Sequence, residues 1–271
     1  MYVSLPPALS DRLQHEGLEI VGKSGMISFS NTFIPYTSGK IGNYKIQNDV
    51  LQEPRNQALH AGAVDLMIEL YRAVEAQGTS PTTRITGGET KDWIFSLPVA
   101  ERVQVPHTLL YKNGQSVDPS LNHATVTHIA DINNNGSSMR DTWLPMIQRE
   151  GGFLEHTLFF IERGEGGTHV LNMLHLDYHA AVYLHNSAWD TLHRGHFIDT
   201  EVYRDICKYR MNKESWAKKM LRSDAGVQKL RELFSSSNAA VRSRAQKILD
   251  KGYPELKEEL GGRLRLNSKV Q

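Results

Sequence analysis

The chain has 271 residues, of which 39% are hydrophobic and 23% charged, and its formal net charge is +1. This length can form one large domain with a sizeable core, or a domain with an extension. No apolar run is long enough to cross a membrane, and residues 1–7 lack the basic start and apolar segment of a secretion signal, so we expect a cytoplasmic protein. The single cysteine, Cys207, excludes an internal disulfide and a cysteine-based zinc site.

Helix-like and strand-like segments alternate through most of the chain. A short helix is predicted over residues 8–15, and β-type residues fill 24–48, with turns at 38–39 and 42–43. Helices are then predicted over 54–74, 93–103 and 137–149, and strands over 82–86, 107–111, 125–130, 157–161 and 181–184. Pro145 should kink the helix that contains it. The alternation predicts an α/β fold with a mainly parallel, twisted sheet flanked by helices, and with ligands at the carboxyl ends of the strands.

The pattern becomes helical after residue 186. Helices are predicted over 200–210, 213–221, 225–234 and 239–249, with Ser187, Thr200 and Asn212 as N-caps. Their apolar spacing favours a buried face over a solvated arm, and we expect residues 261–271 to fray.

Charge is distributed unevenly. Residues 200–271 hold 17 Lys and Arg against 9 Asp and Glu, a balance of +8, whereas residues 1–199 hold 14 against 21, a balance of −7. The favoured interpretation is a helical extension that packs on an acidic surface, because acids are scattered among the basic residues and few aromatics separate them. A nucleic-acid partner is the alternative, and we do not expect one.

The segment 126–138 is the most informative motif. An apolar run ends in Asp131, the polar loop Asn134–Asn135–Gly136 follows, and a helix begins at Ser137–Ser138. Backbone N–H groups in such a loop, together with a helix start, can surround an anion. The acid beside it suits the hydroxyls of a ribose. A plain turn between strand and helix is the alternative interpretation.

Three more loops follow predicted strands and should meet the Asp131 loop at one edge of the sheet. The first, 86–92, has paired glycines that let the backbone approach an anion and a lysine that can neutralise it. The second, 111–114, places Lys112 just past a strand, and the third, 161–167, ends a strand in charges and glycines. Each could be a glycine turn with solvated charges, but four together favour a phosphate-rich ligand.

From about residue 30 to 205, the chain resembles the orotate phosphoribosyltransferases, which have the type I phosphoribosyltransferase fold. Segment 36–44 is similar to the N-terminal hood of the family, segment 86–91 is similar to its pyrophosphate loop, and segment 97–100 is similar to a helix start. Segment 110–112 is similar to the strand before the mobile loop of the family, and segment 130–138 is similar to its phosphoribosyl diphosphate motif. Segment 161–163 is similar to an Asp-Arg pair, and segment 182–184 is similar to the closing strand. The resemblance implies a domain over 1–199, with a hood over about 1–50, and a basic helical extension over 200–271.

The chain also departs from the family pattern. In the phosphoribosyl diphosphate motif, Ala130 replaces the first acid, and Asn134 and Asn135 replace small or hydroxyl residues. In the hood, Thr37 stands where the family has a lysine, and Lys45 and Ile46 stand where it has a pair of Phe residues. The segment 115–122 lacks the Lys-x-His-Gly run of the family.

The resemblance implies phosphoribosyl transfer from 5-phosphoribosyl 1-diphosphate to a base, with orotate favoured, in pyrimidine nucleotide biosynthesis. Lys91, Lys112 and Asp131 are the implied catalytic residues. The diphosphate substrate would contact Thr86, Gly87, Gly88, Glu89, Thr90 and Lys91 at one end, and Asp131, Asn134, Asn135, Gly136, Ser137 and Ser138 at the other. Lys40, Tyr44, Lys45 and Arg163 would contact the base, because a guanidinium matches a carboxylate. Mg²⁺ would bind mainly through the diphosphate, with no assigned protein ligand, and a homodimer is expected.

Two alternatives accompany this hypothesis. The chain has 12 histidines, and His175 and His179 are four residues apart, a spacing that binds zinc on a helix; here they border a predicted strand, so surface or packing roles are favoured. The altered motif also leaves open a transferase for another base, or a non-catalytic protein that binds phosphoribosyl diphosphate or a nucleotide and acts as a regulator.

Overall fold

The computed structural model describes residues 4–117 and 120–266, which form two units. The first unit comprises residues up to 26 together with 48–197, and the second comprises 27–47 and the residues from 198 onward. Segment 27–47, expected within the α/β domain, therefore groups with the C-terminal helices. The two units are described separately below.

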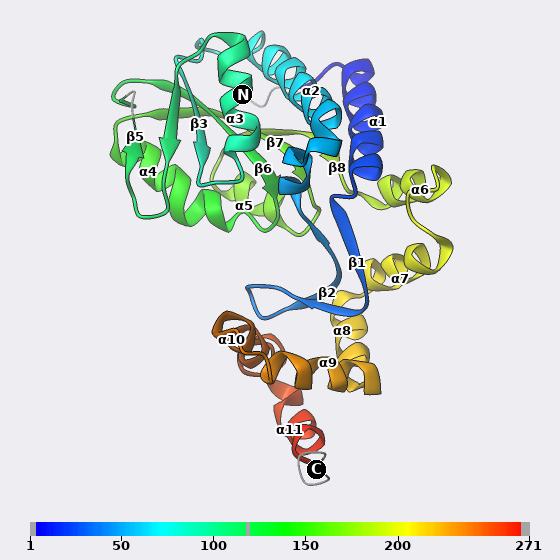
Figure 1. Ribbon diagram of the computed structural model, residues 1–271. Coiled ribbons are helices and arrows are strands. Elements are labelled where there is room, and N and C mark those ends of the chain that lie inside the picture. The colour runs from blue at the N-terminus through cyan, green and yellow to red at the C-terminus, as the bar shows by residue number, and fades with distance from the viewer. Residues whose placement is uncertain (1–3, 118–119, 267–271) are drawn as a thin grey trace. The chain divides into compact units, whose positions relative to one another are not determined.

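A six-stranded sheet forms the centre of the first unit (Figure 1). Its order is β5-β4-β3-β6-β7-β8, and all neighbours are parallel except β5, which is antiparallel to β4. The strands are β3 (Arg84–Gly88), β4 (His107–Leu110), β5 (Ser116–Val117), β6 (Thr125–Asn133), β7 (Phe153–Glu162) and β8 (Asp177–Tyr183). The mainly parallel sheet that the sequence predicts is confirmed.

Helices cover both faces of this sheet. On one face lie α1 (Pro7–Ser24), α2 (Gln57–Glu75) and α3 (Trp93–Val103), and elsewhere in the unit are α4 (Leu144–Arg149), α5 (Gly167–Met173) and α6 (Asn186–Arg194). Neighbouring residues of β7 separate the layers: Phe160 stacks on Phe95 of α3, whereas Phe159 packs in a cluster with Trp143 and Leu171. Successive side chains of a strand point to opposite faces, so β7 is buried on both.

Several boundaries differ from the sequence prediction for local reasons. The first helix continues to Ser24 and ends at Gly25, whose φ of 73° allows the left-handed cap. The segment 137–149 contains a π-helical turn, Met139–Trp143, followed by α4. Pro145, which has no N–H to donate, follows directly after this wider turn in a helical run that is continuous from residue 137, so the predicted kink is replaced by a change of helix type.

The second unit joins a β-hairpin to a set of helices. Strands β1 (Ile27–Pro35) and β2 (Ile41–Ile46) pair antiparallel, and Gly42 and Asn43 lie within β2, not in a turn. The helices are α7 (Thr200–Met211), α8 (Lys213–Arg222), α9 (Asp224–Phe234), α10 (Ala239–Lys247) and α11 (Lys257–Leu266). Fully buried Ile206, Leu221 and Leu230 confirm the predicted apolar faces.

Side-chain caps fix the starts of these helices. Asn212 caps α8 as predicted, whereas α7 is capped by Asp199 and Thr200 is its first residue. Helix α6 begins at Asn186, one residue before the predicted cap Ser187. Of the segment expected to fray, 261–266 belongs to α11 and 267–271 lies outside the described residues. No helix in the described ranges has the length and apolarity to span a membrane.

Candidate functional site

Four loops leave the sheet at one edge, the carboxyl ends of β3, β4, β6 and β7. The register of the parallel strands places Gly88 beside Leu110, and Asn133 beside Glu162, so β3 ends level with β4 and β6 ends level with β7. The loops that follow, at 89–92, 111–115, 134–138 and 163–166, therefore emerge together, as the sequence predicts.

Two carboxyl groups meet at the centre of this edge. Asp131, near the end of β6, is 7% exposed, and its Oδ2 accepts a hydrogen bond from Asn48 Nδ2 at 3.1 Å. Asp92, just before α3, is 8% exposed, and its two oxygens accept from the backbone N–H groups of Gly88 at 2.9 Å and Asp131 at 3.1 Å. Asp92 thereby closes the turn after β3 onto β6.

Burial raises the pKa of both carboxyl groups. For Asp92 the charge of Asp131 adds to burial and moves its pKa well above the usual range. For Asp131, burial also raises the pKa, but hydrogen bonds from Asn48 and Asp92 and the charge of Lys91 oppose it. The pKa of Asp131 therefore rises less than the pKa of Asp92. The side chains also hydrogen-bond to one another, and the arrangement fits a protonated Asp92 that donates to an ionised Asp131.

A neutral histidine lies beneath this pair. His128 on β6 is fully buried, its Nδ1 is 2.9 Å from Thr86 Oγ1, and its Nε2 is 3.8 Å from Asp92 Oδ2. Burial, with a smaller effect of His107, lowers the pKa of His128 to about 3. Thr86, predicted to contact the diphosphate, is fully buried and contacts His128 instead.

Gly87 and Gly88 have a packing role that the sequence did not reveal. Both belong to β3, and a Cβ at Gly87 would lie 2.1 Å from Ser96 Oγ, and one at Gly88 2.2 Å from Trp143 Cζ2. The Gly88 N–H already donates to Asp92, and the Glu89 N–H donates to Leu110 O at 2.9 Å. Their predicted contact with a diphosphate stays a prediction, and it requires the Gly88 N–H to exchange Asp92 for the ligand.

The lysines of the two neighbouring loops lie at the surface. Lys91 Nζ is 3.2 Å from Asp49 Oδ1, and both side chains are about half exposed (52% and 55%). Thr90 is exposed beside it, and the peptide bond between Glu89 and Thr90 is cis. Lys112 is exposed, and its backbone N–H donates to Glu89 Oε2 at 2.9 Å, which ties the two loops together. Both ammonium groups can therefore reach a bound anion, the Lys91 group by leaving Asp49.

The loop after β6 has the predicted order of acid, glycine and helix. Gly136 adopts φ 71°, and a Cβ there would lie 2.7 Å from Val170 Cβ. Both the left-handed backbone conformation and the close approach of Val170 therefore require glycine at this position. Asn135 Oδ1 accepts from the N–H and the Oγ of Ser137, at 3.2 and 2.7 Å. Asn135 thus provides at the helix start the oxygen that a phosphate would otherwise provide. Asn134 and Ser138 are exposed at the same edge.

The charged residues after β7 are mostly turned inward. Glu162 is 1% exposed and accepts from Gly164 N at 2.7 Å and from Asn133 Nδ2. Burial raises the pKa of Glu162 to about 7, against the opposing hydrogen bonds and with a smaller contribution from Glu165. Arg163, predicted to bind the base, is 6% exposed with its Nε 3.9 Å from Glu165 Oε1. Arg163 would have to exchange this contact to bind a carboxylated base.

The other predicted base-binding residues belong to the second unit. Lys40 Nζ donates to Gly252 O at 2.8 Å, pairs with Glu214 at 3.2 Å and lies 4.6 Å from the centre of the Tyr253 ring. Tyr44 is fully buried against the edge of Tyr209, and Lys45 is exposed. Tyr44 therefore packs in a core, and a contact of Lys40 or Lys45 with a base stays a prediction.

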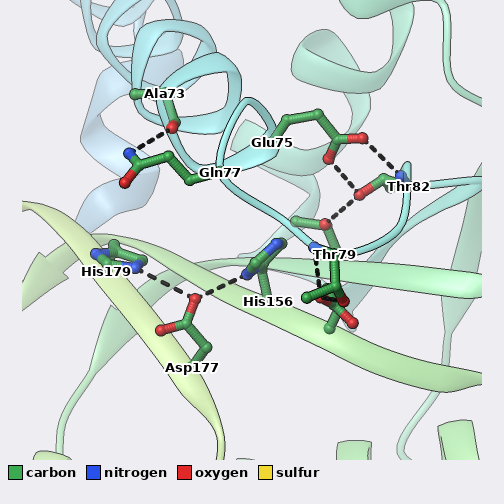
Figure 2. A network of polar contacts seen from close by, with 10 residues as sticks. Ala73, Glu75, Gln77, Thr79, Thr82, His156, Asp177 and His179 are labelled. Atoms are coloured by element: carbon green, nitrogen blue, oxygen red, sulfur yellow. Dashed lines mark hydrogen bonds and ion pairs between the residues drawn. The ribbon is translucent and has the colours of Figure 1, made fainter. Parts of the chain in front are cut away.

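The histidines considered for zinc lie at the amino end of β8, whereas the loops of this edge follow the carboxyl ends of the strands. His175 adopts φ 54° in the turn before β8, and His179 is on the strand, so the helical spacing does not apply. Figure 2 shows the contacts that form: Asp177 Oδ2 is 2.8 Å from His156 Nδ1 and 3.4 Å from His179 Nε2. Among residues 4–117 and 120–266, no group of three or more His, Cys, Asp or Glu side chains is arranged to hold a metal ion.

Solved structures with a similar fold are phosphoribosyltransferases. Leishmania donovani UMP synthase matches with a TM-score of 0.61 at 17% identity, over 72% of this chain and 41% of that one. Orotate phosphoribosyltransferase from Aeropyrum pernix matches with 0.56 at 18% identity, over 65% of this chain and 98% of that one. The enzyme from Francisella tularensis matches with 0.55 at 13% identity, over 72% and 96%. The chain has the phosphoribosyltransferase fold.

This phosphoribosyltransferase fold is shown by structure alone. The chain spans less than half the length of the UMP synthase. No protein-family model matches the sequence, and no curated protein does.

Local packing accounts for the apolar side chain at position 130. Ala130 is 5% exposed and packs with Met139 and Trp143, on the face of β6 opposite to Asp131. The position is a core position in this chain, and the second acid beside Asp131 is Asp92, from another loop. The sequence did not indicate Asp92, Asn48 or His128, because only folding brings them to Asp131.

Proposed function

We propose that the chain transfers a phosphoribosyl group from 5-phosphoribosyl 1-diphosphate to orotate, giving orotidine 5′-phosphate and pyrophosphate, a step of pyrimidine nucleotide biosynthesis. The observation that supports this proposal best is the position of Asp131. It ends a central strand of a phosphoribosyltransferase fold, directly before a glycine loop that opens a helix. This order suits a ribose held next to its 5′-phosphate.

The chemistry requires positioned charges and no strong nucleophile. Transfer breaks the bond between C1 of the ribose and the diphosphate oxygen, and positive charge develops on the sugar ring as the bond breaks. Asp131 accepts hydrogen bonds from the ribose hydroxyls and stabilises that charge. Lys91 and Lys112, from adjacent loops, stabilise the negative charge on the leaving pyrophosphate. Residues 134–138 hold the 5′-phosphate, with Asn135 giving up its bond to Ser137.

Magnesium fits this arrangement as an ion carried by the substrate. Mg²⁺ prefers oxygen ligands, and it usually binds through one or two carboxylates together with substrate phosphates. Asp131 and Asp92 are the carboxylates at the centre of the edge, and both oxygens of Asp92 are already bonded to backbone N–H groups. Mg²⁺ supplies charge neutralisation at the diphosphate when bound.

Orotate as the acceptor rests on Arg163. A guanidinium pairs with a carboxylate through two parallel hydrogen bonds, and orotate is a carboxylated base. Arg163 stands directly after β7 at the same edge as Asp131, where its present neighbour is the carboxylate of Glu165. The carboxylate of orotate would take the place of the Glu165 carboxylate beside Arg163. We further propose a cytoplasmic homodimer, as expected from the sequence.

The test is consumption of orotate by the purified chain with phosphoribosyl diphosphate and Mg²⁺, followed by the loss of orotate absorbance. Calorimetry with orotate, in the presence of pyrophosphate, tests acceptor binding without turnover. If orotate neither reacts nor binds, the orotate assignment fails. Adenine and other bases are then the next acceptors to assay, since a transferase for another base keeps the same phosphoribosyl site.

A regulator is the second candidate, and the burial of Asp131 and Asp92 favours it. The two carboxyl groups, at 7% and 8% exposure, hydrogen-bond to each other and to protein groups. A protein of this kind would bind phosphoribosyl diphosphate or a nucleotide without transferring the sugar. Binding of phosphoribosyl diphosphate with no turnover of any base would support it over the enzyme.

A further inference from the structure

The second unit contains a cavity of about 540 Å³ that the proposed reaction does not use. Strands β1 and β2 form one side, helix α7 another, and Met220 of α8 contributes to the lining. Its volume is within the range of about 300–1,000 Å³ that is typical of small-molecule sites. Every lining residue lies in 27–47 or after 198, so the cavity belongs wholly to this unit.

One of the residues that line the cavity, Asn43, has a buried acceptor without a donor. Asn43 is 2% exposed, and its Nδ2 donates to Asp205 Oδ2 at 2.8 Å, which fixes the orientation of the amide. Its Oδ1 is buried and has no hydrogen-bond partner among the described residues. Leaving a buried acceptor unpaired is costly, so a site that offers one selects a ligand with a donor.

The carboxylate next to it is held rigidly. Asp205 accepts from Asn43 on one oxygen and from Trp216 Nε1, at 2.9 Å, on the other. The side chain is therefore fixed by two donors from different elements, and remaining lone pairs can accept from a ligand. Asn43 and Asp205 together make one side of the cavity an acceptor surface.

The rest of the lining includes an apolar part and a basic part, together with the polar residues Ser30 and Asn31 and the carboxylates of Asp199 and Glu201. Phe29, Val202 and Met220 are half-buried and apolar, and suit the face of a planar ring. Arg204 and Lys208, four residues apart on one face of α7, are exposed, and no hydrogen bond or ion pair engages the side chain of either one in the described part of the chain. Two free cations beside an apolar wall suit a phosphate attached to a ring.

We propose that this cavity binds a nucleoside monophosphate whose base carries an exocyclic amino group. The amino group donates to Asn43 Oδ1, the base packs against Phe29 and Met220, and the phosphate pairs with Arg204 and Lys208. Cytosine and adenine have such an amino group; uracil has a carbonyl oxygen at the equivalent place, which would face the unpaired Asn43 oxygen. The site is separate from the proposed phosphoribosyl site and does not depend on it.

Binding of CMP and UMP provides a matched test, because the two differ only at one edge of the base: cytosine has the amino group at C4 and an acceptor at N3, whereas uracil has a carbonyl oxygen at C4 and an N–H at N3. We expect CMP to bind about tenfold more tightly than UMP by calorimetry, and cytidine about tenfold more weakly than CMP. Trp216 reports on the location, since it donates to Asp205: CMP should shift the Trp216 signal in ¹⁹F NMR of protein labelled with fluorotryptophan, assigned with Trp216→Phe.

Variants complete the test. Lys208→Glu should weaken CMP binding about tenfold, whereas Lys219→Glu, an exposed lysine of α8 outside the cavity lining, should leave it unchanged. Asp131→Asn should also leave the Trp216 shift unchanged, which separates this site from the first unit. Equal binding of CMP and UMP, no effect of Lys208→Glu, or no binding of CMP at millimolar concentration would each overturn the proposal.

Discussion

Glu162 should make the stability of the first unit depend on pH. Its pKa is raised from 4.5 to about 7, mainly by burial, so between these values the folded state binds more protons than the unfolded state. Stability should therefore be highest below pH 4.5, fall as the pH rises through this window, and carry the full penalty above about pH 7.

The size of the effect follows from the two values. The difference between 4.5 and about 7, at ~1.4 kcal/mol per pH unit, corresponds to roughly 3 kcal/mol. Relaxation around the ionised carboxylate reduces this, and we expect about 2 kcal/mol. Glu162→Gln keeps the shape and the bond from Gly164 but cannot ionise, so the stability of the variant relative to the wild type should rise by that amount between about pH 5 and about pH 8.

The measurement is urea unfolding followed by tryptophan fluorescence at several pH values across this range. Glu101→Gln is the matched control, because Glu101 is an exposed carboxylate of α3 in the same unit. If Glu162→Gln and the wild type give parallel profiles, as the control should, the buried carboxylate does not carry the charge penalty that its surroundings imply.

Three further predictions concern the two ends of the sheet. Asp131→Asn should reduce phosphoribosyl transfer about a hundredfold with folding intact, measured by initial rates; an unchanged rate would remove Asp131 from the site. Arg163→Ala should weaken orotate binding about tenfold and phosphoribosyl diphosphate binding much less, measured by calorimetry; equal losses would show a structural role. Asp177→Asn should lower the free energy of unfolding by about 2 kcal/mol at neutral pH, measured by urea unfolding. Burial alone would raise the pKa of Asp177, but hydrogen bonds from His156 and His179 overcome it and hold that pKa well below its usual range. This stability should therefore be present in full above the ordinary aspartate pKa of 3.8 and be lost progressively as the pH falls below it.

The sequence predicts the sheet of the first unit because each strand and helix carries its own periodicity. Strand 153–162 contains the continuous apolar run 158–161, and helices such as 57–75 repeat apolar residues every three or four positions. The Asp131 loop was also predictable, since acid, glycine and helix follow one another in the chain. Local order alone is sufficient for such features.

Other features depend on contacts between distant segments, which the sequence does not display. Gly87 and Gly88 suggest an anion loop, yet their missing side chains make room for Ser96 and Trp143. The strands of 27–47 are extended in either unit, so their grouping with the C-terminal helices could not be inferred from their pattern. Long-range packing decides both cases.

The Asp92 carboxyl group ties two strands together through the two hydrogen bonds that it accepts. Its oxygens hold Gly88 at the end of β3 and Asp131 on β6, whose chain positions are 43 residues apart by number. A ligand that takes the Gly88 N–H therefore also frees Oδ2 of Asp92, which lies 3.8 Å from Nε2 of the buried His128. An anion that binds at the turn after β3 would thus compete directly with the hydrogen bond that ties this turn to Asp92, and would leave the bond from Asp131 N–H as the remaining tie to β6.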